Sequence, residues 1–218
     1  MDLSPLLISF KTAAVSIIIT FFLGLFAARI VAGIKSRTLK MILDGILTLP
    51  LVLPPTVAGF FLLYIFGVYG PIGSFFLNFF SIKIAFSWGA TVLAAFVISF
   101  PLMYRSSRGA LEQMDPDIIN AARTLGLRES TIFWKIRVPT TISGIASGAV
   151  LAFARGLGEF GATAMIAGNI ANRTRTLPLA IYSEVSAGNM DIAGQYVLVI
   201  VLFSFIVVAA MNYFSGKN

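Results

Sequence analysis

Long apolar stretches alternate with short basic segments along the chain. A helix that crosses a bilayer needs about 20 apolar residues, and the chain offers five suitable stretches. We expect spans at Lys11–Arg29, at Asp44–Phe66, at Ile84–Tyr104, from Pro139 onward, and at Ile192–Tyr213. The pattern therefore predicts an all-α, polytopic membrane protein with about five transmembrane helices.

Prolines interrupt the second predicted span. The segment LPLVLPP holds Pro50, Pro54 and Pro55, and each proline removes a backbone hydrogen-bond donor. Irregular backbone at membrane depth is tolerated where it is buried in protein or lines an aqueous path. The prolines therefore indicate either a simple helix kink or part of a translocation path.

Two opposite charges lie within the fourth predicted span, in the segment ARGLGEFGATAM. Arg155 and Glu159 are four residues apart, a spacing that places them on one helical face. Charges inside a membrane are costly and usually mark functional positions, although a structural pair that locks two helices has the same pattern. We predict a gate made of Arg155, Gly156, Gly158, Glu159, Phe160 and Gly161, together with Pro50, Pro54 and Pro55.

Small residues recur at every fourth position earlier in the same span. Gly144, Gly148, Ala152 and Gly156 form a flat stripe along one helical face. Such stripes allow another helix to approach closely. The stripe predicts helix packing, either within the chain or across a homodimer.

Two shorter elements are expected outside the spans. Turn residues fill Gly67–Gly73, and the amphipathic SFFLNFF that follows predicts a short re-entrant or interfacial helix. A second short helix is predicted from Leu177 to Ala187, with Gly188 as its cap.

Basic residues gather after the first and third predicted spans. Cytoplasmic loops of membrane proteins are enriched in lysine and arginine. The segments Arg29–Lys40 and Arg105–Arg137 are therefore predicted to be cytoplasmic. This places the N-terminus outside and the C-terminus inside.

The polar segment Asp115–Pro139 separates the third and fourth spans. Asp115 and Pro116 form a helix start, and Gly126 is a natural terminator. A second helix is predicted at Glu129–Ile136. Two short helices with an apolar face suit a groove on a soluble partner, although a loop packed on its own bundle has the same pattern.

Composition supports a membrane protein and excludes several kinds of chemistry. The chain is 58% hydrophobic and 11% charged, whereas soluble domains carry about 25% charged residues. It holds no cysteine and no histidine, so the commonest metal ligand and general base are missing. We expect no catalytic residue and no metal site. Basic cytoplasmic loops account for the net charge of +7, and we predict no nucleic-acid partner.

The segment NAARTLGLRESTIFWKIRVP resembles the EAA motif of type I ABC importer permeases. The matching positions are Ala121, Ala122, Gly126, Ile136 and Pro139. Three positions depart from the pattern: Asn120 replaces the usual glutamate, Val138 replaces leucine, and Arg128 stands where serine or asparagine often caps the second helix. A neutral hydrogen bond is therefore the most that position 120 can offer a partner.

The resemblance implies that this loop docks on an ATPase and couples its motion to the spans. The expected docking and coupling residues are Ile118, Asn120, Ala121, Ala122, Arg123, Leu125, Gly126, Phe133, Ile136 and Pro139. The packing of Ile118, Ala122, Leu125 and Phe133 into a partner groove is expected to outweigh any charge at position 120.

Other segments extend the resemblance over nearly the whole chain. LTLPLVLPPTVAGFFLL, FPLMYRSSRGALEQMDPDI and LAFARGLGEFGATAMIAGN are similar to the oxyanion branch, and most of all to molybdate permeases. Tungstate permeases are not separable on these residues, and sulfate or thiosulfate permeases are the alternative within the family. The resemblance implies one transmembrane domain over residues 8–213, which contains the cytoplasmic coupling loop 115–139.

The resemblance also implies a set of partners in the cell membrane. These are two ATP-binding cassette ATPase subunits, a second copy of this chain in a homodimer, an extracytoplasmic oxyanion-binding protein and the lipid bilayer. The chain lacks the G-x-x-x-x-G-K-[ST] phosphate loop. We therefore expect no cofactor in this chain, with ATP and Mg²⁺ on the partner subunit.

Two interpretations that assign the chain to another class of protein are weaker. A stand-alone secondary transporter or channel predicts inverted repeats and more charges at the membrane midplane. A purely structural membrane scaffold leaves the spacing of the EAA motif unexplained.

Overall fold

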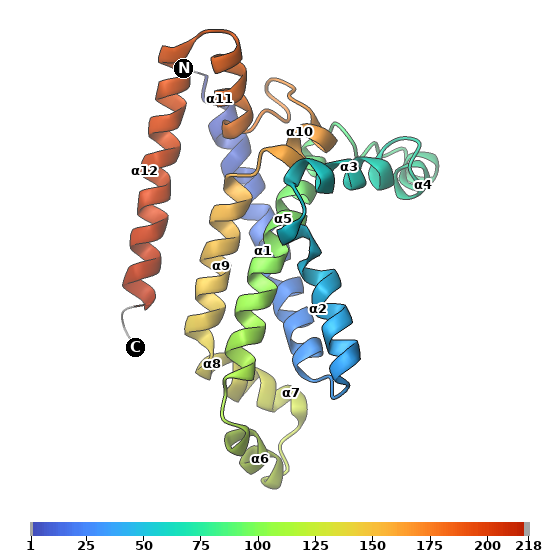
Figure 1. Cartoon of the computed structure of the whole chain (residues 1–218), viewed down its shortest axis with the longest axis vertical. Coiled ribbons are helices and arrows are strands. Elements are labelled where there is room, and N and C mark those ends of the chain that lie inside the picture. The colour runs from blue at the N-terminus through green and yellow to red at the C-terminus, as the bar shows by residue number, and fades with distance from the viewer. Residues whose placement is uncertain (1, 216–218) are drawn as a thin grey trace.

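The fold is a helical bundle with a bent arm and a small loop at one end (Figure 1). The computed structural model describes the backbone of residues 2–215 and the side chains of residues 2–209. Within this part of the chain, three helices are long and apolar enough to cross a membrane alone. They are α1 (Ser4–Ala32), α5 (Trp88–Glu112) and α12 (Met190–Ser215). Two bent helix pairs raise the number to up to five, which agrees with the predicted number of spans.

Helices α1, α5 and α9 (Ile142–Leu157) form the centre of the bundle (Figure 1). Leu25, Met103, Tyr104 and Ile145 meet in its main core cluster. Hydroxyl pairs also join α1 to α5: Thr12 Oγ1 lies 2.9 Å from Thr91 Oγ1, and Thr20 Oγ1 lies 3.2 Å from Ser99 Oγ. Buried hydroxyls that satisfy each other remove the cost of burying polar groups between two apolar helices.

The small-residue stripe of α9 packs inside the chain. A Cβ atom on Gly144 would lie 2.6 Å from Ala110 Cβ, and one on Gly148 would lie 2.6 Å from Ser106 Cβ. Both neighbours belong to α5, and Ser106 Oγ donates a hydrogen bond to the Gly144 carbonyl at 2.8 Å. Of the two predicted uses of the stripe, the structure therefore shows the internal one.

The second predicted span, Asp44–Phe66, is broken into two helices at the prolines that the sequence marks as an interruption. The segment forms α2 (Arg37–Val52) and α3 (Pro55–Phe66), which meet at 110°. Leu53 and Pro54 each precede a proline, and both have extended backbone with ψ of 139° and 135°. Because the residue before a proline is forced out of the helical region, two consecutive prolines produce a sharp turn where one would produce a kink.

Helix α5 is displaced from the predicted span Ile84–Tyr104. It begins at Trp88, where Ser87 Oγ accepts a hydrogen bond from the Ala90 N–H at 3.3 Å, and it continues to Glu112. The change from apolar to charged residues marks a membrane boundary, whereas a helix ends only where its backbone hydrogen bonds end. The helix therefore extends past Tyr104 toward the loop.

The fourth span is bent close to its predicted start at Pro139. Pro139 lies in a preceding helical segment, built from α7 (Glu129–Ile132), the π-helical turn η1 (Phe133–Arg137) and α8 (Val138–Thr140). This segment meets α9 at 75°. Pro139 has no N–H with which to continue an α-helical ladder, and the irregular π-helical turn directly precedes it.

The other short elements agree with the sequence. Helix α4 (Pro71–Phe80) contains the predicted SFFLNFF helix and begins within the turn segment Gly67–Gly73. Helix α11 (Leu177–Ser186) ends at Ala187, and Gly188 adopts a φ of +79°. Together with α10 (Gly161–Ala167), they lie at the end of the bundle opposite to α6 (Pro116–Thr124) (Figure 1).

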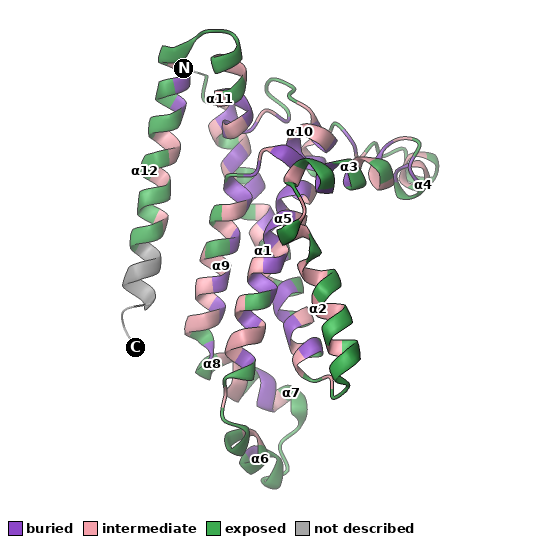
Figure 2. Ribbon diagram, viewed as in Figure 1, coloured by how far each residue is buried: buried purple, intermediate pink, exposed green. Residues whose placement is uncertain are grey.

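Exposed apolar residues cover the outside of the bundle (Figure 2). Helix α12 is the clearest case, because only 11% of its apolar membrane-spanning stretch is buried within the chain. Apolar side chains that find no protein partner lower their free energy in lipid. The distribution of burial therefore fits a membrane protein, as predicted.

Candidate functional site

The break between α2 and α3 meets a further break, between α9 and α10. A Cβ atom on Gly161, the first residue of α10, would lie 2.9 Å from Pro55 Cβ and 3.2 Å from the Thr56 backbone nitrogen. On the facing helix, a Cβ atom on Gly59 would lie 2.7 Å from Ala162 Cα. Helices α3 and α10 thus touch with almost no side chain between them. Glycine is the residue that permits such an approach.

Glu159 lies between α9 and α10 and is 2% exposed. Its Oε1 atom accepts a hydrogen bond from the Ala162 backbone N–H at 2.7 Å. The Arg155 Nη1 atom lies 2.7 Å from Oε2, but Oε2 accepts no well-directed hydrogen bond from any described residue. We therefore regard the Arg155 contact as a charge attraction, and the amide contact as the bond that orients the carboxylate. This confirms the pairing predicted from the spacing of four.

The structure brings part of the predicted gate together and leaves the rest apart. Pro55, Gly161 and the Arg155–Glu159 pair flank the two breaks. Pro50 lies inside α2 and lines a separate cavity of about 290 Å³ with Phe96 and Phe100.

The remaining gate residues have different surroundings. Gly156 packs against Ser16 and Ala95 in the bundle core. The ring of Phe160 lies 5.3 Å from that of Tyr182. Pro54 and Gly158 are exposed. Gly156 therefore serves helix packing as the structure stands, whereas Phe160 contacts α11.

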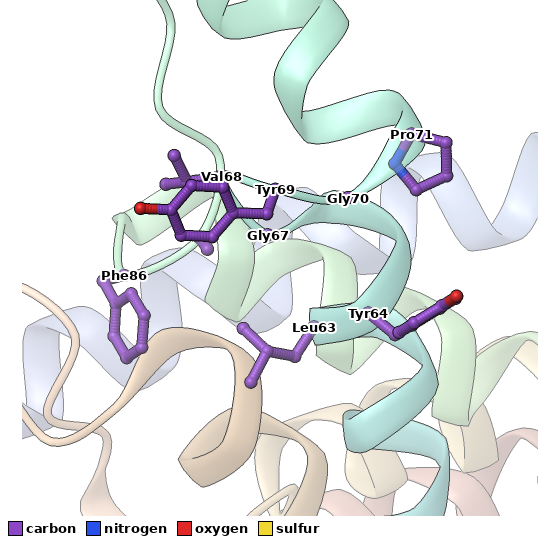
Figure 3. A pocket seen from close by; sticks show the side chains of 9 residues that line it. Leu63, Tyr64, Gly67, Val68, Tyr69, Gly70, Pro71 and Phe86 are labelled. Atoms are coloured by element: carbon purple, nitrogen blue, oxygen red, sulfur yellow. The ribbon is translucent and has the colours of Figure 1, made fainter.

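A cavity of about 410 Å³ opens where α3 turns toward α4 (Figure 3). Leu63, Tyr64, Tyr69 and Phe86 line it, together with glycines of the turn. None of its described lining residues is charged. The cavity therefore offers an anion no compensating charge, and we do not assign it to a substrate.

Metal chemistry finds no support in the described part of the chain. Within residues 2–209, no group of three or more acidic residues is placed to hold a metal ion. The sequence also holds no histidine and no cysteine, two of the side chains that most often bind transition metals.

The loop between α5 and α9 has the predicted two-helix form. Asp115 Oδ1 accepts a hydrogen bond from the Asp117 N–H at 2.9 Å and starts α6. Gly126 adopts a φ of +73°, and the Leu127 N–H bonds back to the Ala122 carbonyl at 3.2 Å. This is the usual geometry of a helix that ends at glycine.

An ion pair that the sequence analysis did not identify joins the two loop helices. Arg123 Nε donates to Glu129 Oε1 at 2.6 Å. The hydrogen bond from Arg123 lowers the pKa of the Glu129 carboxyl below its ordinary value. The pair spans the turn at Gly126 and links α6 to α7.

The expected docking residues divide into an exposed group and a buried group. Leu125 is 80% exposed and Ile118 is 45% exposed, whereas Ala122 and Phe133 are buried. Asn120, Ala121 and Arg123 belong to the exposed group, Ile136 is half-buried, and Gly126 and Pro139 are exposed.

Phe133 packs into the core of its own chain, where we had expected it to face a partner. Its ring lies 4.4 Å from the Arg29 guanidinium in the last turn of α1, and it belongs to the same cluster as Leu25 and Tyr104. A buried aromatic ring beneath an arginine is a firm anchor. Phe133 therefore attaches the loop to the bundle and is not available as a docking contact in this conformation.

A group of charged side chains between α2 and α5 also escaped the sequence analysis. Asp44 contacts Arg108, and Glu112 contacts both Arg108 and Lys40. One signal was present in the sequence: Arg108 and Glu112 are four residues apart, the spacing of a helical ion pair. The pairing with Asp44 depends on how α2 packs, which the sequence does not state.

Comparison with known proteins shows that the chain is similar to membrane components of transport systems. A family model described as "Binding-protein-dependent transport system inner membrane component" matches residues 20–217. The chain is 42% identical to the putative molybdenum transport system permease protein YvgM of Bacillus subtilis, over 93% of this chain and 89% of that protein. It is 46% identical to the molybdenum transport system permease protein ModB of Escherichia coli K12, over 81% of this chain and 77% of that protein.

Solved structures show the same fold. A structure of the MetNI methionine ABC transporter in inward-facing conformations matches with a TM-score of 0.76 at 16% identity, over 97% of this chain and 93% of that chain. A bacterial ABC transporter involved in the import of the polysaccharide alginate matches with a TM-score of 0.79 at 13% identity, over 99% and 79%. These identities are low, so the two structures bear on the fold alone.

Proposed function

The chain belongs to the binding-protein-dependent transport system inner membrane component family, and from this premise we propose that it is the permease subunit of an ATP-driven molybdate importer. The observation that carries the proposal is the identity of 42% and 46% to two molybdenum transport permeases along most of the chain. The bundle, the broken helices and the two-helix loop give that function a physical basis.

The family implies two kinds of partner, an ATPase and a binding protein that delivers the substrate. The chain has no phosphate-binding loop of its own, so the energy for transport comes from the ATPase. We infer two ATPase subunits and two copies of this permease in one complex. Tungstate, which has the same charge and tetrahedral shape as molybdate, is a second substrate of the same proposal.

The exposed tip of the loop is the surface that we assign to the ATPase. Leu125 and Ile118 present apolar side chains next to Arg123, as expected for a helix that enters a groove. Phe133 holds the other end of the loop in the core. A push on the tip is therefore transmitted to the bundle instead of being absorbed by a flexible linker.

The two helix breaks are the part of the bundle that we assign to gating. Helices α9 and α10 are separated by Gly158, Glu159 and Phe160, and α2 and α3 by Leu53 and Pro54. A break concentrates rotation at a few residues, whereas an unbroken helix moves as a rigid rod. Contact between the breaks makes their movements interdependent.

Reconstitution tests the proposal. The permease, its ATPase and the binding protein are placed in proteoliposomes, and uptake of molybdate is followed with and without ATP. We expect uptake that requires all three proteins, competition by tungstate and little competition by sulfate. Uptake without the ATPase would instead indicate a stand-alone transporter, and preferential uptake of sulfate would indicate the sulfate branch.

A further inference from the structure

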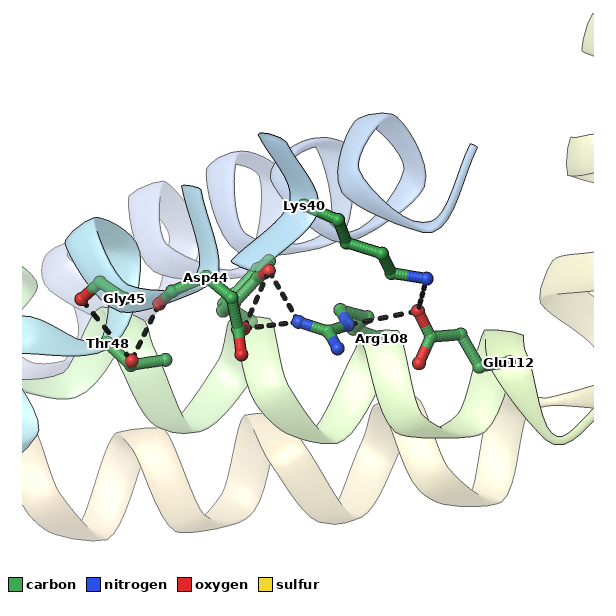
Figure 4. Close-up of polar contacts among 7 residues, drawn as sticks. Lys40, Asp44, Gly45, Thr48, Arg108 and Glu112 are labelled. Atoms are coloured by element: carbon green, nitrogen blue, oxygen red, sulfur yellow. Dashed lines mark hydrogen bonds and ion pairs between the residues drawn. The ribbon is translucent and has the colours of Figure 1, made fainter. Parts of the chain in front are cut away.

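A chain of ion pairs ties α2 to the last two turns of α5 (Figure 4). Lys40 Nζ lies 2.6 Å from Glu112 Oε1, and Arg108 Nε donates to the same oxygen at 3.0 Å. The other side of the Arg108 guanidinium contacts Asp44 Oδ1. Tyr104 also donates its hydroxyl hydrogen to Asp44 Oδ1 at 3.1 Å. We call Lys40, Asp44, Arg108 and Glu112 the α2–α5 strap.

The strap is a large part of what holds α2 in place. None of the described residues of α2 is buried, and its contacts with the core come from half-buried Leu43 and Leu47. By contrast, Tyr104 on α5 is completely buried and belongs to the main core cluster. Asp44 therefore connects a loosely packed helix to a rigid one.

The strap side chains are shielded from water to an intermediate degree. The Arg108 side chain is 20% exposed and those of Asp44 and Glu112 are 33% exposed. Fully exposed pairs contribute little because water screens them. Bonds between ionised groups that are partly shielded are stronger and directional, so they can carry a displacement from one helix to the other.

The two ends of the strap lie on different parts of the proposed machinery. Glu112 is the last residue of α5, and the loop begins at Asp115. Asp44 lies on α2, which leads to the break at Pro54 and Pro55. Movement of the loop can thus reach the contact between Pro55 and Gly161 through the strap and α2. This path is separate from the one through Phe133 and α9.

A binding role for the same residues is less consistent with the charges. A cavity of about 170 Å³ adjoins the strap and is lined by Arg105 and Arg108, but also by Asp44 and Glu112. An anion there would meet two carboxylates. The geometry therefore favours a mechanical role over an anion site.

We propose that Asp44 and Arg108 are positioning residues that make α2 and α5 move as one unit. When the loop end of α5 moves, their contact moves α2 and the α2–α3 break with it. The proposal rests on the proposed function, because it assumes that the loop is driven by an ATPase. Neither residue is assigned a contact with the substrate.

The first test measures coupling in the reconstituted complex of permease, ATPase and binding protein. Arg108→Gln and Asp44→Asn are expected to leave assembly and basal ATP hydrolysis unchanged, and to lower molybdate uptake per ATP hydrolysed by about tenfold, the scale of one lost hydrogen bond to a charged group. The exchange Asp44→Arg with Arg108→Asp should restore part of the loss. The control is Arg105→Gln on the same helix, because Arg105 makes no ion pair within the described residues.

The second test uses the natural lack of cysteine. Lys40→Cys and Glu112→Cys allow α2 and α5 to be joined by a short bis-maleimide. If the helices move as one unit, the joined protein retains most of its uptake. Loss of uptake on joining would overturn the proposal, and so would unchanged uptake per ATP in both single variants. Failure of the wild-type complex to import molybdate would instead count against the proposed function.

Discussion

Gly161 of α10 lies so close to Pro55 of α3 that a methyl group on the glycine would sit 2.9 Å from the proline Cβ. Helices α2 and α3 are separated at prolines, helices α9 and α10 are separated at a glycine-rich segment that holds Glu159, and the two breaks meet at this point. Backbones that approach this closely leave no space for a side chain between the two helices. Rotation at one break must therefore be accompanied by movement at the other.

Substitution of Gly161 by alanine tests this contact. The added methyl group must displace Pro55 or α10, and overpacking of this kind costs about 1–3 kcal/mol. We expect a lower thermal unfolding temperature of the purified permease and reduced molybdate uptake. Gly194→Ala is the matched control, since no described atom lies within 4 Å of its Cβ position and α12 belongs to neither break. Equal effects of the two substitutions would show that the closeness of the breaks is unimportant.

Two substitutions at Glu159 separate its two contacts. Glu159→Gln keeps an oxygen that can accept from the Ala162 N–H but removes the charge that faces Arg155. Glu159→Ala removes both contacts. We expect the alanine variant to unfold more easily than the glutamine variant by about 1 kcal/mol, the usual contribution of a helix cap.

The role of the charge follows from comparing uptake with thermal stability in the two variants. If the Arg155 pair acts in gating, Glu159→Gln reduces uptake even though the protein remains stable. If the pair only locks two helices, uptake follows thermal stability in both variants. Measurement of both quantities on the same preparations decides between these alternatives.

The sequence was most informative where a local rule is strong. Asp115, Pro116 and Gly126 predicted the limits of α6, because caps and glycine terminators act through the few residues beside them. The Arg155–Glu159 pair was predicted for the same reason, as its partners are one helical turn apart.

The sequence was least informative where packing between distant segments decides the outcome. LPLVLPP indicated a disturbance in a span, but the angle of 110° also depends on what α3 packs against. Phe133 has an apolar side chain that suits a partner groove or a core equally well, and only the position of α1 shows that it faces inward. Asp44 and Arg108 are 64 residues apart, so no local pattern reveals their contact.

Gly126 provides a test of the loop conformation. Its φ of +73° is accessible to glycine, whereas another residue there costs about 1–2 kcal/mol. Gly126→Ala should loosen the turn between α6 and α7 and lower the ATPase stimulation produced by the loaded binding protein, and Gly126→Asp should do the same. Gly109→Ala is the control, because no described atom lies within 4 Å of its Cβ position. Unchanged stimulation in the Gly126 variants would remove the loop from the coupling path.

The Arg123–Glu129 pair predicts how the loop responds to acid. The pKa of Glu129 is lowered from its ordinary value of 4.5 by the hydrogen bond from Arg123. The contribution of the pair to loop stability is therefore fully present above pH 4.5 and is lost as the pH falls through the lowered pKa. Spin labels on Asp117→Cys and Ser130→Cys should report a constant distance from neutral pH down to about this value and a wider distribution below it. In Glu129→Gln the distribution should be wide at every pH.

Leu125 and Asn120 provide the sharpest test of how the loop binds its ATPase. Leu125 is 80% exposed. The exposed side chain of Asn120 makes no hydrogen bond to any described residue, and only the backbone carbonyl of Asn120 accepts one, from the Thr124 hydroxyl at 3.0 Å. If docking depends on apolar burial, Leu125→Asp should abolish co-purification of the ATPase, because a charge would enter an apolar groove. Asn120→Asp should then reduce it only slightly. Leu3→Asp, at the opposite end of the bundle with 58% of the residue exposed, controls for the loss of an exposed leucine. The reverse ranking of Leu125 and Asn120 would mean that the ATPase binds the loop mainly through charge. A charged group of the ATPase would then contact the neutral amide of Asn120.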